Sequence, residues 1–447
     1  DRPVVFIGPY EHHSNEVPWR ESIAEVVTID EDADGRVNLK SLEAQLVRYA
    51  ARPLKIGSFS AASNVTGIGT DTRKVSALLH KHGALAFWDF AAAGPYVKIE
   101  MNMGDDGEDG RLVYKDAIFL SPHKFIGGPG TPGLLIAKKK LFTNRVPTTP
   151  GGGTVAFVTA DAHEYHAEPV HREEGGTPAI IESIRAGLVF QLKDAVGWEA
   201  IRAREQAFIA RAIARWRECE NIHILGNVDA WRLSIVSFMV RHGDGYLHHN
   251  FVVALLNDLL GVQARGGLSC AGPYGHRLLG IDASTSKRFQ CAILAGLTGV
   301  KPGWVRINFN YFVSDLVFDF MVDAVAFVAQ HGWKLIPHYR FCPKTGQWTH
   351  RKGRPGTLSL RDLEYTGGQL SYTTQRPTAP ERALRAYLAE AERIVAEADR
   401  EAATLEIEDP IMPEDAEPLR WFPLPSDIKR ELLGPDNRRP LPIHLGA

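Results

Sequence analysis

Lys124 is the residue whose type and position most clearly indicate a chemical role. It lies in the segment SPHKFIGGPGTPG at residues 121–133. An apolar run at residues 117–120 precedes this segment and is typical of a buried strand. The residues after Lys124 are rich in Gly and Pro, and they therefore predict a loop rather than a helix. A lysine at a strand end can lose its proton through partial desolvation and attack a carbonyl carbon. Lys124 is thus a candidate for a Schiff base, whereas a lone lysine elsewhere would be a solvated surface charge.

Two other apolar runs end in polar side chains that suit the same chemistry. Residues 85–89 end in the carboxylate of Asp89, and residues 55–64 end in the amide of Asn64. A carboxylate there can keep a pyridine nitrogen protonated, so that the ring accepts electrons from a substrate carbanion. An amide can donate a hydrogen bond to the phenolic oxygen of such a ring. Because ligands bind at the carboxyl ends of strands in open α/β sheets, we expect these groups to face one site.

Several motifs follow one another in a consistent order along the first part of the chain. They are EHHSNEVPW at residues 11–19, SNVTG at 63–67, the strand-terminal Asp89, SPHK at 121–124, PGGGT at 150–154 and EGGTP at 174–178. Together they resemble the class V aminotransferase family of pyridoxal-phosphate enzymes, and most of all its cysteine desulfurase and selenocysteine lyase branch. The resemblance covers about residues 1–330.

The resemblance implies roles around pyridoxal 5'-phosphate for four residues. Lys124 would carry the internal aldimine, and Asp89 would pair with the pyridine nitrogen. His12 would stack on the ring face, and Asn64 would approach the phenolic oxygen or the substrate.

The resemblance also implies how the cofactor phosphate is held. Ser121 and His123 would bind it from the same chain. Thr177 corresponds to the residue that reaches the phosphate of the partner subunit, which implies a homodimer.

Three further residues are implied to act on the substrate. Residues 264–273 match the family's mobile loop, in which an arginine, here Arg265, is followed by the nucleophilic cysteine, here Cys270. A thiol is competent for this role when it is exposed in electropositive surroundings, and the alternative is that Cys270 is a small loop residue. Arg306 corresponds to the arginine that clamps the substrate carboxylate through a bidentate contact, and Arg265 is a second candidate for substrate binding.

Two departures from the family pattern leave the substrate open. Phe90 and Ala92 alter the Asp-x-x-Gln pattern at the ring edge, and Leu268 and Ser269 stand where two histidines usually precede the cysteine. The favoured hypothesis is a transferase or lyase that resembles cysteine desulfurase or selenocysteine lyase, with Cys270 as sulfur acceptor. One alternative is a class V aminotransferase or epimerase without a cysteine nucleophile. Another is a non-catalytic binding protein built on a degraded fold of this kind.

The elements that must position these residues alternate between short apolar strands and helical patterns over residues 1–140. Continuous apolar strands are typical of a parallel sheet covered on both faces, and they predict an α/β fold. The resemblance implies the fold type I, aspartate-aminotransferase-like architecture, with a large cofactor-binding domain at residues 1–185 and a small α+β domain at 186–334 that carries the Cys270 loop and Arg306.

Residues 335–447 lie outside the resemblance and form a C-terminal extension. An amphipathic helix is predicted over residues 379–406, and we favour its docking on its own chain over docking on a partner. The Pro-rich tail after Asp409 is predicted to be extended. Pro178 is predicted to lie in the first turn of a long helix.

The start of the sequence leads at once into a strand pattern at residues 4–8. Relatives implied by the resemblance have roughly a hundred residues before this strand, which is the size of a small domain. We therefore expect this chain to be truncated at its N-terminus and its anchoring of the cofactor phosphate to be incomplete.

Composition narrows the class of protein further. The chain has 447 residues, of which 44% are hydrophobic, and a formal net charge of -2, which is typical of a globular protein without affinity for nucleic acid. It contains no apolar run long enough to span a bilayer. The four cysteines form no CxxC pair and predict reduced thiols in a cytoplasmic protein. The spacing of His163, His166 and His171 is unlike a familiar zinc site, so we predict no metal.

Overall fold

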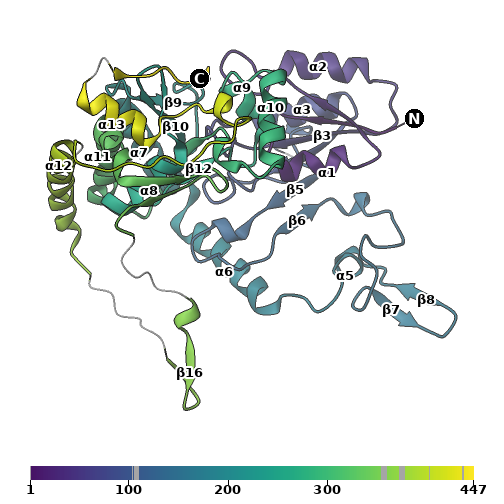
Figure 1. Ribbon diagram of the computed structural model, residues 1–447. Coiled ribbons are helices and arrows are strands. Elements are labelled where there is room, and N and C mark those ends of the chain that lie inside the picture. Colours follow the sequence, from purple (N-terminus) through teal and green to yellow (C-terminus); the bar gives the residue numbers. More distant parts are fainter. Residues whose placement is uncertain are drawn as a thin grey trace. The chain divides into compact units, whose positions relative to one another are not determined.

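The structure is a computed structural model that describes residues 2–102, 104, 110–353, 360–371, 378–401, 403–434 and 437–446. The chain divides into two compact units (Figure 1). The first consists of Asp1–Gln206 and Asp229–Leu233, and the second of Ala207–Val228 and Ser234–Ala447. None of the helices described combines the length and the apolar character needed to cross a bilayer.

The first unit is built on a six-stranded sheet in the order β2-β1-β3-β4-β5-β6. The first five strands are parallel, whereas β6 runs antiparallel to β5. Every residue of β1 and β3 is buried, and β1 is a continuous apolar run, as is typical of a strand covered on both faces. The strands are β1 (Val4–Ile7), β2 (Glu25–Thr28), β3 (Lys55–Ser60), β4 (Leu85–Asp89), β5 (Ala117–Leu120) and β6 (Leu134–Ala137).

Capping residues determine where the helices that pack on this sheet begin. Asn38 caps α2 (Leu39–Arg48) by accepting from Ser41 N at 3.0 Å, and Asp71 caps α3 (Thr72–Lys81) by accepting from Lys74 N at 3.0 Å. The helix α3 packs on β4, with α2 beside it (Figure 1). Other helices that begin among the described residues of this unit are α1 (Val17–Arg20), α5 (Pro169–Glu173), α6 (Ile180–Val196) and α7 (Trp198–Arg217).

Three features of the segment between β6 and α7 differ from the sequence pattern: the place of Pro178, a break at Gly197 and a hairpin. The prediction for Pro178 is wrong, because α6 begins at Ile180 with Ala179 as its N-cap, so Pro178 lies before the helix. Gly197, with a φ of 83°, separates α6 from α7. The segment before α6 also forms a β-hairpin that projects from the sheet (Figure 1), made of β7 (Val155–Val158) and β8 (His163–Tyr165).

The second unit contains an antiparallel sheet in the order β11-β10-β13-β12, with β9 also paired to β10. The apolar helix α8 packs on β12 and β13, and α11 packs on α8. The strands are β9 (Ile222–Ile224), β10 (Ile235–His242), β11 (Gly245–Tyr246), β12 (Arg265–Gly267) and β13 (Trp304–Asn308). The helices are α8 (His249–Leu260), α9 (Gly272–Leu278), α10 (Ala283–Leu294) and α11 (Asp315–His331).

The C-terminal extension folds onto the second unit. The helix α12 (Leu384–Glu401) buries Ala391, Val395 and Ala398 and packs against α11 and the 3-10 helix η5 (Gly332–His338), so it docks on its own chain. The prediction of an extended tail is wrong over α13 (Pro425–Leu433), which also packs on η5. The extension further contains the hairpins β14 (Tyr339–Cys342) with β15 (Gln347–His350), and β16 (Glu364–Thr366) with β17 (Gln369–Ser371).

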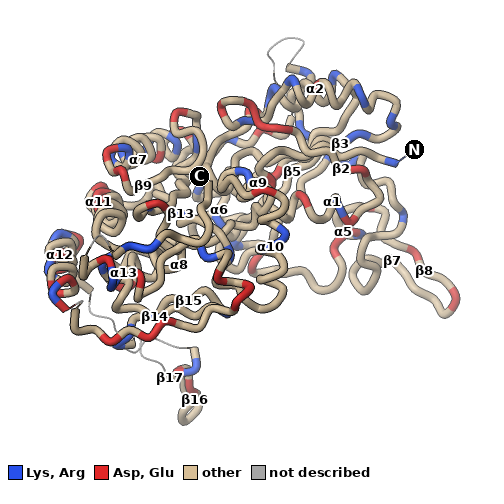
Figure 2. The backbone as a smooth tube through the Cα atoms, turned by 45° about the horizontal axis from the view of Figure 1, so that its top comes forward, with Lys and Arg blue, Asp and Glu red and all other residues tan. Residues whose placement is uncertain are grey.

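Charged residues of both signs are interspersed along the backbone of each unit (Figure 2). This distribution agrees with the formal net charge of -2.

Candidate active site

Asp89 and Lys124 lie at the carboxyl ends of two neighbouring strands in the sheet of the first unit. Asp89 is the last residue of β4, and Lys124 ends the 3-10 helix η2 (Pro122–Lys124), which follows β5 directly. Burial raises the pKa of the Asp89 carboxyl, while a hydrogen bond from Ala91 N at 2.7 Å and the charge of Lys124 act to lower it. The carboxylate and the amine are therefore close enough to interact electrostatically.

The segment around Lys124 is a tight turn that depends on a glycine at position 128. Lys124 N donates to Ser121 O at 3.0 Å, and Phe125 N donates to Pro122 O at 3.0 Å. A Cβ on Gly128 would lie 2.0 Å from Pro122 O, so this position requires glycine. The turn leaves Lys124 and His123 exposed and Ser121 partly buried.

The imidazole of His12 is held in one orientation. Its Nδ1 accepts a hydrogen bond from Ser14 N at 3.1 Å, at the start of the 3-10 helix η1 (His13–Asn15). A backbone donor at Nδ1 requires that this nitrogen carry no proton, which places the proton of the neutral ring on Nε2. His12 is partly buried, whereas the adjacent His13 is exposed.

Asn64 lies in the turn that follows β3. The hydroxyl of Ser63 orders this turn by accepting from Val65 N at 3.1 Å and Thr66 N at 3.2 Å. Four neighbouring strands, β1, β3, β4 and β5, are thus each followed or ended by one candidate residue: His12, Asn64, Asp89 and Lys124. Because these four strands are parallel neighbours, the four residues follow or end them at the same end of the sheet.

Thr177 lies in a different part of the first unit. It is exposed and precedes α6. Gly176 N donates to Gly152 O at 2.7 Å, so the two glycine motifs at residues 150–154 and 174–178 lie side by side.

In the second unit, Arg265 and Arg306 are direct register partners on the antiparallel strands β12 and β13. Like charges at directly opposite positions of two strands are unfavourable for a sheet. Arg265 is exposed and Arg306 is partly buried.

Cys270 lies after β12 and before α9 in a strained backbone conformation. Among the residues that the structure describes, Ser269 and Cys270 are the two non-glycine positions with positive φ, at 53° and 57°. Each such residue costs about 1–3 kcal/mol, and strain of this kind clusters at functional sites. Neither residue type favours the left-handed region, so the sequence held no signal for this feature. Cys270 is partly buried.

Glu11 is a buried residue to which the sequence analysis gave no role. Burial raises the pKa of its carboxyl from the ordinary value of 4.5 to about 7, against the lowering effect of its hydrogen bonds to Ser60 and Asn15, and the nearby Asp89 raises it further. The one signal in the sequence was its position directly before His12.

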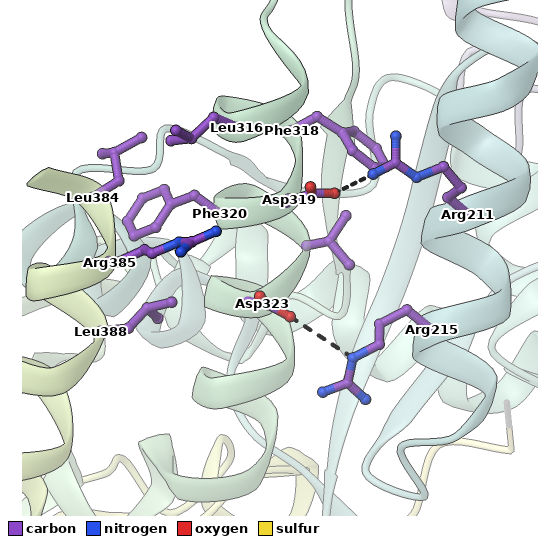
Figure 3. A pocket seen from close by; sticks show the side chains of 11 residues that line it. Arg211, Arg215, Leu316, Phe318, Asp319, Phe320, Asp323, Leu384, Arg385 and Leu388 are labelled. Atoms are coloured by element: carbon purple, nitrogen blue, oxygen red, sulfur yellow. Dashed lines mark hydrogen bonds and ion pairs between the residues drawn. The ribbon is translucent and has the colours of Figure 1, made fainter. Parts of the chain in front are cut away.

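A separate cavity of about 500 Å³ lies in the second unit between α7, α11 and α12 (Figure 3). Ion pairs cross one side of it, from Arg211 to Asp319 and from Arg215 to Asp323, while Leu384 and Leu388 line the other. Its lining contains none of the predicted site residues. No group of side chains suited to a metal ion occurs among the described residues.

Comparisons with known proteins point to one family. Residues 2–292 match the family model described as Aminotransferase class-V. The chain is 29% identical to probable cysteine desulfurase 2 of Mycobacterium leprae over 291 residues, which is 64% of this chain and 64% of that protein. It is 28% identical to a probable cysteine desulfurase of Halalkalibacterium halodurans over 273 residues, 60% of this chain and 62% of the relative. The chain therefore spans less than two thirds of the length of these relatives.

Solved structures show the same fold. The apo cysteine desulfurase from Thermococcus onnurineus NA1 is similar with a TM-score of 0.59 at 23% identity, covering 74% of this chain and 73% of that one. The cysteine desulfurase CsdA from Escherichia coli is similar with a TM-score of 0.56 at 21% identity, covering 72% of this chain and 71% of that one.

Proposed function

The chain belongs to the class-V aminotransferase family, and on this premise we propose that it is a pyridoxal-phosphate enzyme that removes sulfur from cysteine. The observation that carries the proposal is the placement of Asp89 and Lys124 at neighbouring strand ends, within electrostatic reach of each other. The names of the curated relatives support cysteine as the substrate.

The residues at this edge of the sheet fit pyridoxal phosphate. The amine of Lys124 suits the aldehyde of the cofactor, and the buried carboxyl of Asp89 suits its ring nitrogen. The oriented ring of His12 suits the face of the pyridine, and the amide of Asn64 suits its phenolic oxygen. When bound, the cofactor supplies an electron-accepting ring that stabilises a carbanion at the substrate α-carbon.

The phosphate and the substrate require further groups. We assign the phosphate to Ser121 and His123, which flank Pro122 in the turn that carries Lys124. Lys124 is exposed at the end of this turn, so its Nζ can hold the proton that moves to and from the substrate. We assign the substrate carboxylate to Arg306 and Arg265, which are register partners on β13 and β12, because a guanidinium group can bind a carboxylate through two hydrogen bonds.

Cys270 accepts the sulfur. Its thiolate attacks the sulfur of the substrate cysteine, the bond from that sulfur to Cβ breaks, and the electron pair of this bond stays on carbon, where a proton joins it. Cysteine and the Cys270 thiol thereby give alanine and a persulfide on Cys270, and no oxidant is needed. The left-handed backbone at Ser269 and Cys270 supports this role, since the fold maintains a strained conformation at the residue concerned.

A second copy of the chain is the partner we assign. The residues Ile180, Ile184, Leu188 and Leu192 recur every fourth position on α6, and each is exposed, by 58%, 58%, 56% and 42%. An exposed apolar stripe of this length is typical of a surface that another protein covers. Thr177 directly precedes the stripe, which supports its role in reaching the partner's cofactor. The four cysteines are free, which supports a reducing, cytoplasmic setting.

The test is to mix the purified chain with pyridoxal phosphate and record its visible absorption, and then to add cysteine and measure alanine and sulfide in the presence of a reductant. Cys270→Ala should retain the absorption and lose alanine and sulfide formation. Cys291→Ala, which removes an exposed thiol on α10, should lose neither. Unchanged alanine formation in Cys270→Ala would exclude Cys270 as the acceptor. A wild-type chain that develops no absorption would exclude the cofactor.

A further inference from the structure

The carboxyl of Glu11 is the centre of a buried hydrogen-bond network at the edge of the sheet that carries the candidate site. Its Oε1 accepts from Gly8 N at 3.2 Å and Ser60 N at 2.9 Å, and its Oε2 accepts from Asn15 Nδ2 at 2.6 Å and Ser60 Oγ at 2.7 Å. These donors come from the end of β1, from η1 and from β3. Glu11 is 4% exposed, so the bonds form away from water and tie three segments together.

The surroundings of this carboxyl are shaped to receive it. A Cβ on Gly8 would lie 2.5 Å from Glu11 Oε1, so the close approach depends on glycine at this position. Asn15, which donates to Glu11, in turn accepts from Ser58 Oγ at 2.6 Å. Each partner is thereby fixed by a further bond, which favours one arrangement of the network over others.

The network connects two residues of the candidate site. On one side, Glu11 directly precedes His12 in the chain. On the other side, Ser60 is the register partner of Asp89 in the parallel pair β3 and β4, and Ala61 N donates to Asp89 O at 2.9 Å. Any shift of the Glu11 carboxyl therefore moves the start of η1 relative to the end of β4.

We propose that Glu11 is a positioning residue that fixes His12 and Asp89 relative to each other through Ser60, so that both can contact one pyridine ring. This inference rests on the proposed function, because it concerns the same cofactor. It extends the site to a residue that touches neither the cofactor nor the substrate. The pKa of the Glu11 carboxyl, raised by burial to about 7 and also raised by Asp89, agrees with the closeness of the two acids.

If Glu11 only stabilised the fold, its replacement would lower stability without an effect on cofactor binding. Asp116 provides a matched control for this comparison. Asp116 is another fully buried carboxyl of the same sheet, and it accepts from Ala86 N at 3.0 Å and pairs with His80 Nε2 at 2.9 Å. It directly precedes β5 and therefore lies at the opposite end of the strands from Lys124. Asp116→Asn should lower stability without any effect on the cofactor site.

The experiment measures the unfolding temperature of each variant without cofactor, the Kd for pyridoxal phosphate, and the pH at which the spectrum of the bound cofactor changes. Glu11→Ala should raise the Kd roughly tenfold, the equivalent of one lost charge-assisted hydrogen bond, and should shift the spectral titration. Glu11→Gln, which keeps the size of the side chain, should restore part of the affinity. Asp116→Asn should leave both cofactor measurements at the wild-type values.

Glu11→Ala with wild-type Kd and wild-type spectral titration would overturn the inference, whatever its stability. If Glu11→Ala does not fold, Ser60→Ala replaces it, because it removes only the hydroxyl bond to Glu11; an unchanged Kd in Ser60→Ala would equally overturn the inference. A wild-type chain that binds no pyridoxal phosphate would overturn the proposed function and, with it, this inference. Binding of pyridoxal phosphate by the wild type thus distinguishes failure of the proposed function from failure of this inference.

Discussion

Lys124, at the end of η2, lies close enough to Asp89, at the end of the neighbouring strand β4, for its positive charge to oppose the rise that burial causes in the pKa of the Asp89 carboxyl. A nearby positive charge favours the ionised form of a carboxyl. A pyridine ring bound between them would meet an amine at one end and a carboxylate at the other.

Pyridoxal phosphate should attach covalently to Lys124 alone. Lys193 and Lys115 are competing amines in the same unit, because burial lowers the pKa of each to about 8. However, Lys193 Nζ donates to Gly94 O at 2.6 Å and Val97 O at 2.5 Å, and Lys115 Nζ donates to Glu100 O at 2.7 Å. Reduction of the complex with borohydride followed by peptide mass spectrometry should find the label on residue 124. Lys124→Ala should take up no label, and a label found on Lys193 would contradict the assignment.

Loss of Arg265 should weaken cysteine binding without loss of stability. Arg265→Gln removes one of two like charges that face each other across β12 and β13, so the unfolding temperature should stay the same or rise. The KM for cysteine should rise about 10- to 100-fold, since a charged hydrogen bond to the carboxylate is lost. Arg241→Gln, at an exposed position of β10, is the control and should change neither quantity. An unchanged KM in Arg265→Gln would remove this residue from the site.

The sequence predicted the elements whose signals are local. The α/β fold with a mostly parallel sheet is confirmed. Its local signals are the apolar runs of β1 and β5 and the caps of α2 and α3. The predictions of secondary structure are wrong where tertiary packing, and not the local sequence, determines the structure. The helix α13 forms in a Pro-rich tail because it packs on η5, and Pro178 lies before α6 instead of within its first turn.

The residues of the candidate site are likewise of two kinds: those that the local sequence marks and those that only the fold brings together. Lys124 and Asp89 were identified because each follows an apolar run directly, so the strand end marks them. Glu11 was not identified, because its partner Ser60 is 49 positions away and only the sheet brings the two together. The facing of Arg265 and Arg306 likewise depends on the register of two strands, which no local pattern specifies.

The apolar stripe on α6 should hold two copies of the chain together. Leu188→Glu places a charge in the middle of this stripe, where 56% of the leucine is exposed, and burial of that charge against a second copy would be unfavourable. Light scattering should therefore report a dimer for the wild type and a monomer for the variant. Leu294→Glu on α10, where 79% of the leucine is exposed, is the control and should remain a dimer. A dimer in both variants would place the interface elsewhere.

Glu11 should make stability fall as the pH rises toward neutrality. Burial raises the pKa of its carboxyl from 4.5 to about 7 in the folded state, and Asp89 raises it further, while the unfolded chain keeps the ordinary value. Between these two values the folded chain holds a proton that the unfolded chain has lost. The stability that this proton contributes is therefore fully present below pH 4.5 and is lost as the pH passes through about 7.

Glu11→Gln should remove this pH dependence, because an amide does not titrate. The free energy of unfolding of the wild type, compared with the variant, should decline by an amount on the order of 3 kcal/mol between the two pKa values. Denaturant unfolding at a series of pH values measures it. Asp116→Asn is the control of opposite sign: burial acts to raise the pKa of Asp116, but hydrogen bonds from His80 and Ala86 lower it overall, so its contribution is lost only on acidification. If the free energy of unfolding changed equally with pH in the wild type and in Glu11→Gln, this carboxyl would be ionised in the folded chain throughout the range.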